Sequence, residues 1–129
     1  MKDEVRGWLT FAAEDLKMAE LALQEGIYNQ ACFHAEQCAE KSLKAMILSK
    51  GQMPPHTHKL TDLLSFLPKN FHKSKRKEII LLDRFYVPTR YPDALPGTLP
   101  EGLPTQKDAE QAIKIARQLS IEVKQAIEK

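Results

Sequence analysis

Apolar residues recur at every third or fourth position near the start of the chain. The repeated positions are Val5, Leu9, Ala12, Leu16, Ala19 and Leu23. This spacing places their side chains on one face of an α-helix. Glycine is the residue type that most often ends a helix, and Gly26 follows this run directly. The pattern therefore predicts a first helix that ends near Gly26.

A second helix is predicted over residues 28–50, ending at Gly51. Small residues form one stripe along it, namely Ala31, Ala35, Ala39 and Ser42. Small side chains allow a neighbouring helix to approach closely. Three larger apolar residues lie off this stripe, so we expect another helix or another subunit to cover a second face: Phe33, Ile47 and Leu48.

Three further helices are expected in the rest of the chain. Residues 58–67 carry leucines with helical spacing, and Thr57 is a suitable N-cap. Residues 74–86 have a weaker apolar period. The last helix opens at Thr105, with Asp108 placed three residues later as in a capping box. Since no stretch alternates with the period of a strand, the sequence predicts an all-α, up-and-down bundle of four or five helices in one domain, 1–129.

The segment 87–104 interrupts this helical pattern. Prolines recur in it at every fourth position: Pro88, Pro92, Pro96, Pro100 and Pro104. A loop of this length inside a small domain is usually either functional or disordered. Two interpretations stay open, a functional loop stiffened by proline and a simple crossover to the last helix.

Composition narrows the class of protein. Of the 129 residues, 43% are hydrophobic and 28% are charged, which is typical of a globular domain. No apolar run approaches the roughly 18 residues of a membrane-spanning helix, and the first residues do not resemble a secretory signal. The 19 basic and 17 acidic residues nearly balance, so charge alone does not indicate a nucleic-acid-binding protein.

The two cysteines indicate a reducing compartment. Cys32 and Cys38 lie six residues apart on one predicted helix, which separates their Cα atoms by about 9 Å. That distance exceeds the reach of a disulfide bond. We therefore expect free thiols and a cytoplasmic location.

Charged residues on the second helix are candidates for a binding site. Gln37, Glu40, Lys41 and Lys44 form a polar stripe opposite the alanines. The stripe is either a solvated surface or part of a groove in which a lysine meets a phosphate. Asp15 lies near the apolar stripe of the first helix, where we expect an ion pair with Lys41 or Lys44, or a role in ligand binding.

The sequence Arg90-Tyr91-Pro92-Asp93 follows Tyr86 closely. An arginine beside aromatic rings can stack on a nucleobase and grip a phosphate. Alternatively, Arg90 contacts Asp93 within a turn and Tyr91 packs against the bundle.

Histidines and lysines give weaker signals. His56 and His58 lack the further ligands that a metal needs, so we expect no metal site, and His58 is interpreted as packing at a helix start. A basic cluster is either a solvated turn or a contact for RNA or an acidic partner: Lys69, Lys73, Lys75, Arg76 and Lys77. Motifs alone give no complete active site, so no catalytic residue is assigned.

Several of these segments together resemble the HEPN family (higher eukaryotes and prokaryotes nucleotide-binding). They are the stretch from Trp8 to Ala19, the run GIYNQACFHAEQCAEKSLKA at 26–45, THKL at 57–60, and Tyr86 with RYPD at 90–93. The resemblance extends over about residues 5–125. It implies a helical bundle that is usually a homodimer and is often encoded beside a minimal nucleotidyltransferase.

The resemblance also implies a function. Some HEPN proteins are metal-independent ribonucleases, including toxins, that carry Arg, four to six residues and then His. None of the five arginines here has such a histidine, and Leu95, Pro96 and Gly97 occupy the window after Arg90. We therefore expect a nucleotide-binding or regulatory partner of a nucleotidyltransferase. The alternatives are a ribonuclease toxin with an atypical site and a structural dimerisation module.

For a bound nucleotide, ATP or GTP, the sequence predicts where each part of the ligand lies. The phosphates are expected near Lys41, Lys44 and Arg90. The base is expected against Tyr86 or Tyr91. Asp93 would orient Arg90, because a carboxylate beside a phosphate is repulsive.

Overall fold

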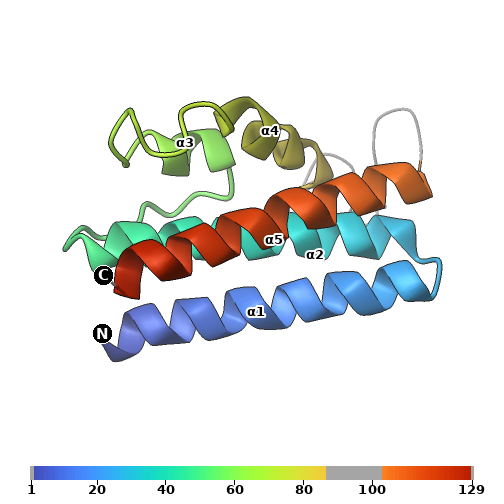
Figure 1. Ribbon diagram of the computed structural model, residues 1–129, viewed down its shortest axis with the longest axis horizontal. Helices are drawn as coiled ribbons and strands as arrows, with labels where there is room; N and C mark the ends of the chain where they lie inside the picture. The colour runs from blue at the N-terminus through green and yellow to red at the C-terminus, as the bar shows by residue number, and fades with distance from the viewer. Residues whose placement is uncertain (1, 87–102, 129) are drawn as a thin grey trace.

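The computed structural model describes residues 2–86 and 103–128, and all regular structure in these residues is helical (Figure 1). In chain order the elements are α1 (Asp3–Gln24), α2 (Tyr28–Ser49), α3 (Leu60–Leu64), α4 (Arg76–Leu81), the 3-10 helix η1 (Leu82–Phe85) and α5 (Gln106–Glu128). The prediction of an all-α bundle is confirmed.

The three long helices form the body of the bundle (Figure 1). α1 and α2 are antiparallel, whereas α2 and α5 run in the same direction. Two contacts fix this parallel register: the Tyr28 hydroxyl lies 3.3 Å from Gln106 Oε1, and the Cys38 sulfur lies 4.0 Å from the Ala116 carbonyl oxygen. Both pairs are separated by 78 residues. The chain between α2 and α5 returns along the bundle as the short helices α3, α4 and η1.

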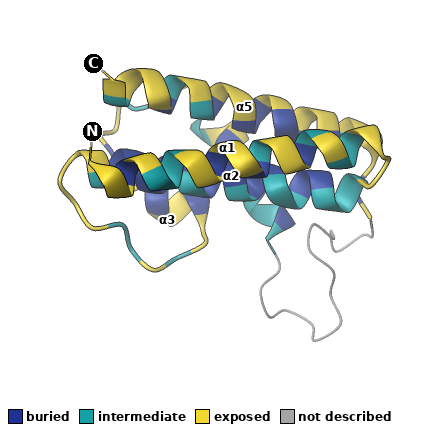
Figure 2. Ribbon diagram, turned by 90° about the horizontal axis from the view of Figure 1, so that it is seen from below, coloured by how far each residue is buried: buried dark blue, intermediate teal, exposed yellow. Residues whose placement is uncertain are grey.

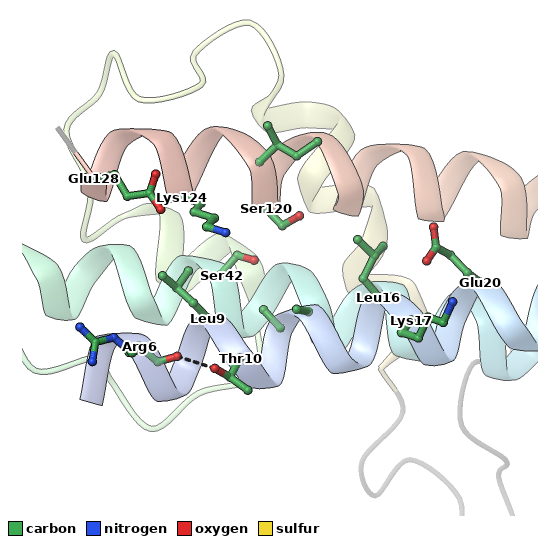
Figure 3. A pocket seen from close by; sticks show the side chains of 13 residues that line it. Arg6, Leu9, Thr10, Leu16, Lys17, Glu20, Ser42, Ser120, Lys124 and Glu128 are labelled. Carbon is green, nitrogen blue, oxygen red and sulfur yellow. Dashed lines mark hydrogen bonds between the residues drawn. The ribbon is translucent and has the colours of Figure 1, made fainter. Parts of the chain in front are cut away.

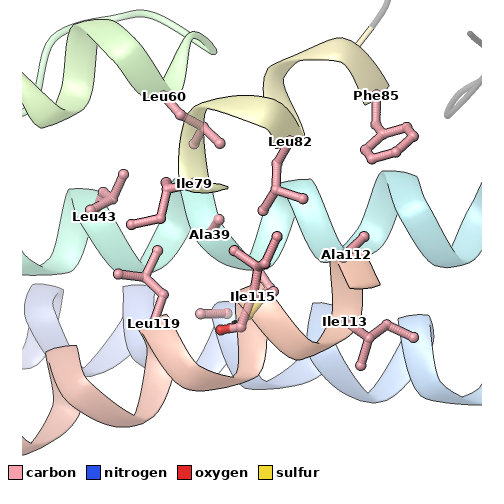
Figure 4. Packing of buried hydrophobic residues seen from close by; sticks show 14 of the residues in the cluster. Ala39, Leu43, Leu60, Ile79, Leu82, Phe85, Ala112, Ile113, Ile115 and Leu119 are labelled. Carbon is pink, nitrogen blue, oxygen red and sulfur yellow. Dashed lines mark hydrogen bonds between the residues drawn. The ribbon is translucent and has the colours of Figure 1, made fainter. Parts of the chain in front are cut away.

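α2 lies at the centre of the packing, and buried positions occur along most of its length (Figure 2). Ala31, Ala35 and Ala39 are fully buried, as their small size predicted. On another side of α2, the short helices contribute Leu60, Ile79, Leu82 and Phe85, which pack over α2 together with residues of α5 (Figure 4). α2 is therefore covered by α1, by α5 and by the short helices.

This packing decides between the two kinds of cover expected for the second face of α2, another helix or another subunit. For Ile47 the cover is another helix, because this residue is fully buried within a single chain. The reason is that the short helices cover the side of α2 on which it lies. Phe33 and Leu48 are only partly buried.

Most of the predicted helix ends are confirmed. Gly26 (φ 74°) and Gly51 (φ 82°) follow α1 and α2 with positive φ values, which glycine adopts without strain. Thr105 and Asp108 form the expected capping box: the Thr105 amide donates to Asp108 Oδ2 at 2.9 Å, and the Asp108 amide donates to Thr105 Oγ1 at 3.2 Å.

The short helices differ from the prediction. α3 spans five residues rather than the ten of 58–67, and Thr57 is not its N-cap. The carboxylate of Asp83 takes that role instead, because it accepts the Leu60 amide at 2.6 Å and the Thr61 amide at 3.4 Å. The fourth predicted helix, 74–86, begins two residues later and tightens into η1.

The described residues bear on the expectations about cysteines, metal ligands and membrane helices, and on little of the proline-rich segment. Both cysteines are free and buried, and burial raises the pKa of each thiol to about 12. In the part of the chain that the structure describes, no group of His, Cys, Asp and Glu side chains could hold a metal ion, and no helix could cross a membrane. Most of the proline-rich segment, 87–102, lies outside the described residues.

We predict that the protein forms a homodimer in solution. Several large apolar side chains are about half exposed on a single chain, among them Phe11 (53%), Met18 (50%) and Leu21 (43%), and burial of such side chains favours association. Light scattering at tens of micromolar should give about twice the chain mass of 14.7 kDa. A particle of one chain mass at that concentration would contradict the prediction.

Candidate functional site

One side of α2 carries a group of interacting polar side chains that we call the Glu40 cluster: Glu36, Glu40, Lys44, His58 and Tyr86. Glu36, Glu40 and Lys44 lie one turn apart along α2. All three are buried, although charged side chains are almost never fully buried unless they are paired. The contacts of these three residues therefore decide what the cluster can do.

Glu40 is the centre of the cluster. One carboxylate oxygen, Oε2, accepts a bond from Lys44 Nζ at 3.2 Å, and the other, Oε1, lies 3.1 Å from His58 Nδ1. Lys44 also lies over the Trp8 ring, with 5.4 Å between Nζ and the ring centroid. Both charges of the Glu40–Lys44 pair are thus satisfied inside the protein.

His58 is held in a defined orientation. Its Nδ1–H donates to Glu40, so the second ring nitrogen, Nε2, keeps its lone pair in the neutral ring. The ring stacks on Tyr86, with centroids 4.5 Å apart and planes inclined by 24°. Because 53% of the His58 side chain is exposed, an oriented, flat imidazole faces solvent beside a tyrosine.

Glu36 differs from Glu40 because it has no cationic partner. It accepts a bond from Gln37 Nε2 at 2.7 Å, while its Oε2 has no hydrogen-bond partner among the described residues. Burial, and then the nearby Glu40 carboxylate, raise the pKa of Glu36 to about 9. At neutral pH this side chain is a neutral acid, which avoids placing a second unpaired negative charge beside Glu40.

A second polar group joins α2 to α1. Asp15 accepts bonds from Lys41 Nζ at 2.5 Å and from His34 Nδ1 at 2.9 Å. Burial pushes the pKa of Asp15 upward, but these two bonds and the Lys41 charge hold it below 3.8. The expected ion pair of Asp15 is confirmed, with Lys41 as the partner.

The structure places three of the six residues expected at a nucleotide site. Lys44 and Tyr86 belong to one chain of contacts, which runs through Glu40 and His58. Lys41 lies one turn away and is bound to Asp15. The other three expected residues lie outside the described residues: Arg90, Tyr91 and Asp93.

Glu36, Glu40 and His58 are the members of the cluster whose roles the sequence did not reveal. Glu40 and His58 lie 18 residues apart, and no motif connects them. His58 was expected only to pack at the start of a helix, whereas the structure places it before α3 with its ring on Tyr86. A signal was present in the unusual composition of α2, because two glutamates and a lysine there share the side that carries Leu43 and Ile47.

A separate hollow of about 550 Å³ lies between α1 and α5 (Figure 3). Leu9 and Leu16 face it from α1, and Ser42 and Ser120 face it from α2 and α5. Apart from the charged side chains at its rim, the lining is mostly aliphatic. Among the described residues, no histidine and no buried charged side chain lines this hollow, so the Glu40 cluster is the better candidate for a functional site.

Comparison with known proteins identifies the family. The model of the HEPN domain matches residues 5–126, which is nearly the whole chain. The chain belongs to the HEPN family. A protein of Methanocaldococcus jannaschii named "Putative toxin MJ1304" is 29% identical to this HEPN chain, and the match covers 81% of this chain and 76% of the relative.

Two solved structures share this HEPN fold over almost their full length. TT1696 from Thermus thermophilus superposes with a TM-score of 0.79 at 34% identity, covering 96% of this chain and 98% of that one. ST0689, described as an archaeal HEPN homologue, superposes with a TM-score of 0.77 at 32% identity, covering 98% and 99%. The helices that carry the Glu40 cluster are therefore part of a common HEPN architecture.

The neutral Glu36 side chain predicts an unusual dependence of stability on pH. The pKa of Glu36 in the folded protein, about 9, lies above the ordinary value of 4.5. Between these values the folded protein holds a proton that the unfolded chain releases. The contribution of Glu36 to the free energy of unfolding is therefore complete below pH 4.5. As the pH rises from 4.5 towards 9, this contribution falls by on the order of 1 kcal/mol per pH unit.

Glu36→Gln should remove this dependence, because glutamine is neutral and can still accept the bond from Gln37. We expect the variant to be more stable than the original chain at pH 8, by a margin that shrinks towards pH 5. Urea unfolding at several pH values measures this, with the exposed Glu110→Gln as a matched control. If Glu36→Gln lowered stability equally at every pH, Glu36 would have to be ionised in the folded protein.

Proposed function

We propose that this HEPN protein binds a nucleotide at the Glu40 cluster and acts in a toxin–antitoxin type of pair with a small nucleotidyltransferase. The observation that carries the proposal is the half-exposed His58 ring, which Glu40 orients and Tyr86 stacks against. Aromatic faces of this kind bind nucleobases by stacking.

The bound nucleotide would use the cluster and the segment that follows it. The base would extend the stack of His58 and Tyr86. Lys44 would contribute positive charge, although a phosphate there would share its ammonium with Glu40. Since Lys41 is bound to Asp15, a larger share of phosphate binding would fall to Arg90. Tyr91 would stack on the base, and Asp93 would orient Arg90.

The proposed biological role follows from the family and from the relative of M. jannaschii, whose name describes it as a toxin. In such a pair, the nucleotidyltransferase would be the partner that restrains this chain. The proposed setting is the cytoplasm, which suits two buried, free cysteines. A nucleotidyltransferase gene beside the gene for this chain, and rescue of growth when both are expressed together, would support the pairing.

Calorimetric titration with ATP and with GTP tests the binding site. Removing the ring in His58→Ala should weaken binding at least fivefold, because stacking of a base on a ring contributes roughly 1–3 kcal/mol. His56→Ala is the matched control, since it removes an exposed imidazole two positions away, and it should leave the affinity unchanged. Arg90→Ala should weaken binding at least tenfold, because a hydrogen bond between Arg90 and a phosphate would contribute roughly 1.5–3 kcal/mol to the free energy of binding.

Two results would contradict the proposed site. Equal affinity of the original chain, His58→Ala and Arg90→Ala would place the ligand elsewhere. No heat with either nucleotide would instead favour the third possibility, a structural dimerisation module.

A ribonuclease function is the second candidate, and a specific observation favours it. A histidine oriented by a buried carboxylate can take up and return protons, which cleavage by a 2′-hydroxyl requires. The family's Arg and His spacing is absent from the sequence, however. In a ribonuclease with an atypical site, His58, oriented by Glu40, would take the proton-transfer role of the missing histidine.

We predict that the purified protein leaves RNA intact over hours. General acid or base assistance is typically worth about 10²–10⁴-fold in rate, and the family's histidine is missing from its window. Gel analysis of a labelled RNA checks this. Cleavage that disappears in His58→Ala but persists in His56→Ala would overturn the prediction and assign the proton transfer to His58.

A further inference from the structure

A strongly basic stretch spans the turn between α3 and α4 and the start of α4. Five of the 19 basic residues fall within residues 69–77, and this stretch contains no acidic residue. The rest of the chain holds 14 basic against 17 acidic residues. The positive charge of the protein is therefore concentrated in this turn, which we call the basic turn.

The backbone of the basic turn is fixed by Arg76. Its guanidinium donates three hydrogen bonds to carbonyl oxygens, those of Phe71 (2.9 Å), Leu64 (3.1 Å) and Pro68 (2.6 Å). His72 has a φ of 48°, and its Nδ1 lies 2.8 Å from Glu122 Oε2 on α5. The turn thus has a defined shape and is attached to the last helix.

Three of the other four cations of the turn face solvent. Lys75 pairs with Glu122 at 3.1 Å. Lys69, Lys73 and Lys77 are exposed and form no ion pair with any described residue. A bound polyanion would neutralise these like charges, which repel one another.

A hollow of about 810 Å³ borders two lysines of the turn, Lys73 and Lys75. Asn70, Lys73, Ser74 and Lys75 line it on the side of the turn, and Glu122 borders it on α5. A second hollow, of about 380 Å³ with Lys114 in its lining, borders the same Glu122. Glu122 therefore lines both hollows, one together with Lys73 and Lys75 and the other together with Lys114.

We infer that the basic turn binds the phosphodiester backbone of a nucleic acid. Lysines together with Ser and Asn side chains are the groups that typically contact phosphates. A carboxylate-rich protein partner fits less well, because bidentate recognition of carboxylates relies on arginine. The one arginine of the turn is committed to three backbone carbonyls.

Fluorescence anisotropy with a labelled 20-nucleotide RNA tests the inference on the full chain. Combining Lys69→Ala, Lys73→Ala and Lys77→Ala should weaken binding at least tenfold at low salt. It should also reduce the slope of log affinity against log salt concentration by about 2, because each of the three lost phosphate contacts contributes roughly 0.7 to that slope. The control combines Lys17→Ala, Lys50→Ala and Lys107→Ala, which removes the same charge from exposed positions elsewhere.

The expected result is a loss in the first triple variant, little change in the control, and similar binding of single-stranded DNA of the same length. Equal losses in both variants would show that net charge alone drives binding, and would overturn the inference. So would tighter binding of a poly-glutamate peptide than of RNA, or no binding of RNA by the original chain. Since these variants leave His58 and Tyr86 untouched, nucleotide titration on the same samples tests the Glu40 cluster separately.

Discussion

A helix that is covered on most sides must find partners inside the protein for every charge that it carries. α2 meets this constraint with two different solutions. Lys41 reaches Asp15 on α1, and Lys44 turns back to Glu40 one turn earlier. Glu36 has no cation and remains protonated instead. The orientation of His58, and with it the candidate site, follows from the need of Glu40 for donors on both oxygens.

The same constraint changes the interpretation of the polar stripe on α2. From the sequence alone, the lysines of the stripe were candidates for binding phosphates. In the folded protein both lysines are paired with carboxylates, so the local field is close to neutral. What the site offers a ligand is an oriented imidazole and stacking surface, whereas the concentrated positive charge lies in the basic turn between α3 and α4.

Much of the fold was predictable because α1, α2 and α5 are long and strongly periodic. Their ends carry local sequence signals, such as the glycine at position 26, which adopts a positive φ, and the capping-box residues Thr105 and Asp108. The short helices were misjudged because their limits depend on distant groups. Asp83 caps α3 from 23 residues away. The pairing of His58 with Glu40 is equally invisible to local patterns, whereas Asp15 was recognisable because a lone carboxylate at a core edge needs a partner.

The parallel register of α2 and α5 has a consequence for how the protein is made. Contacts between these helices join residues 78 positions apart, as in the pair of Tyr28 and Gln106. α1 and α2 can associate early during synthesis, but the alanine stripe of α2 has no α5 to cover it until the last residues emerge. At about 5–20 residues per second this exposed intermediate persists for seconds on the ribosome.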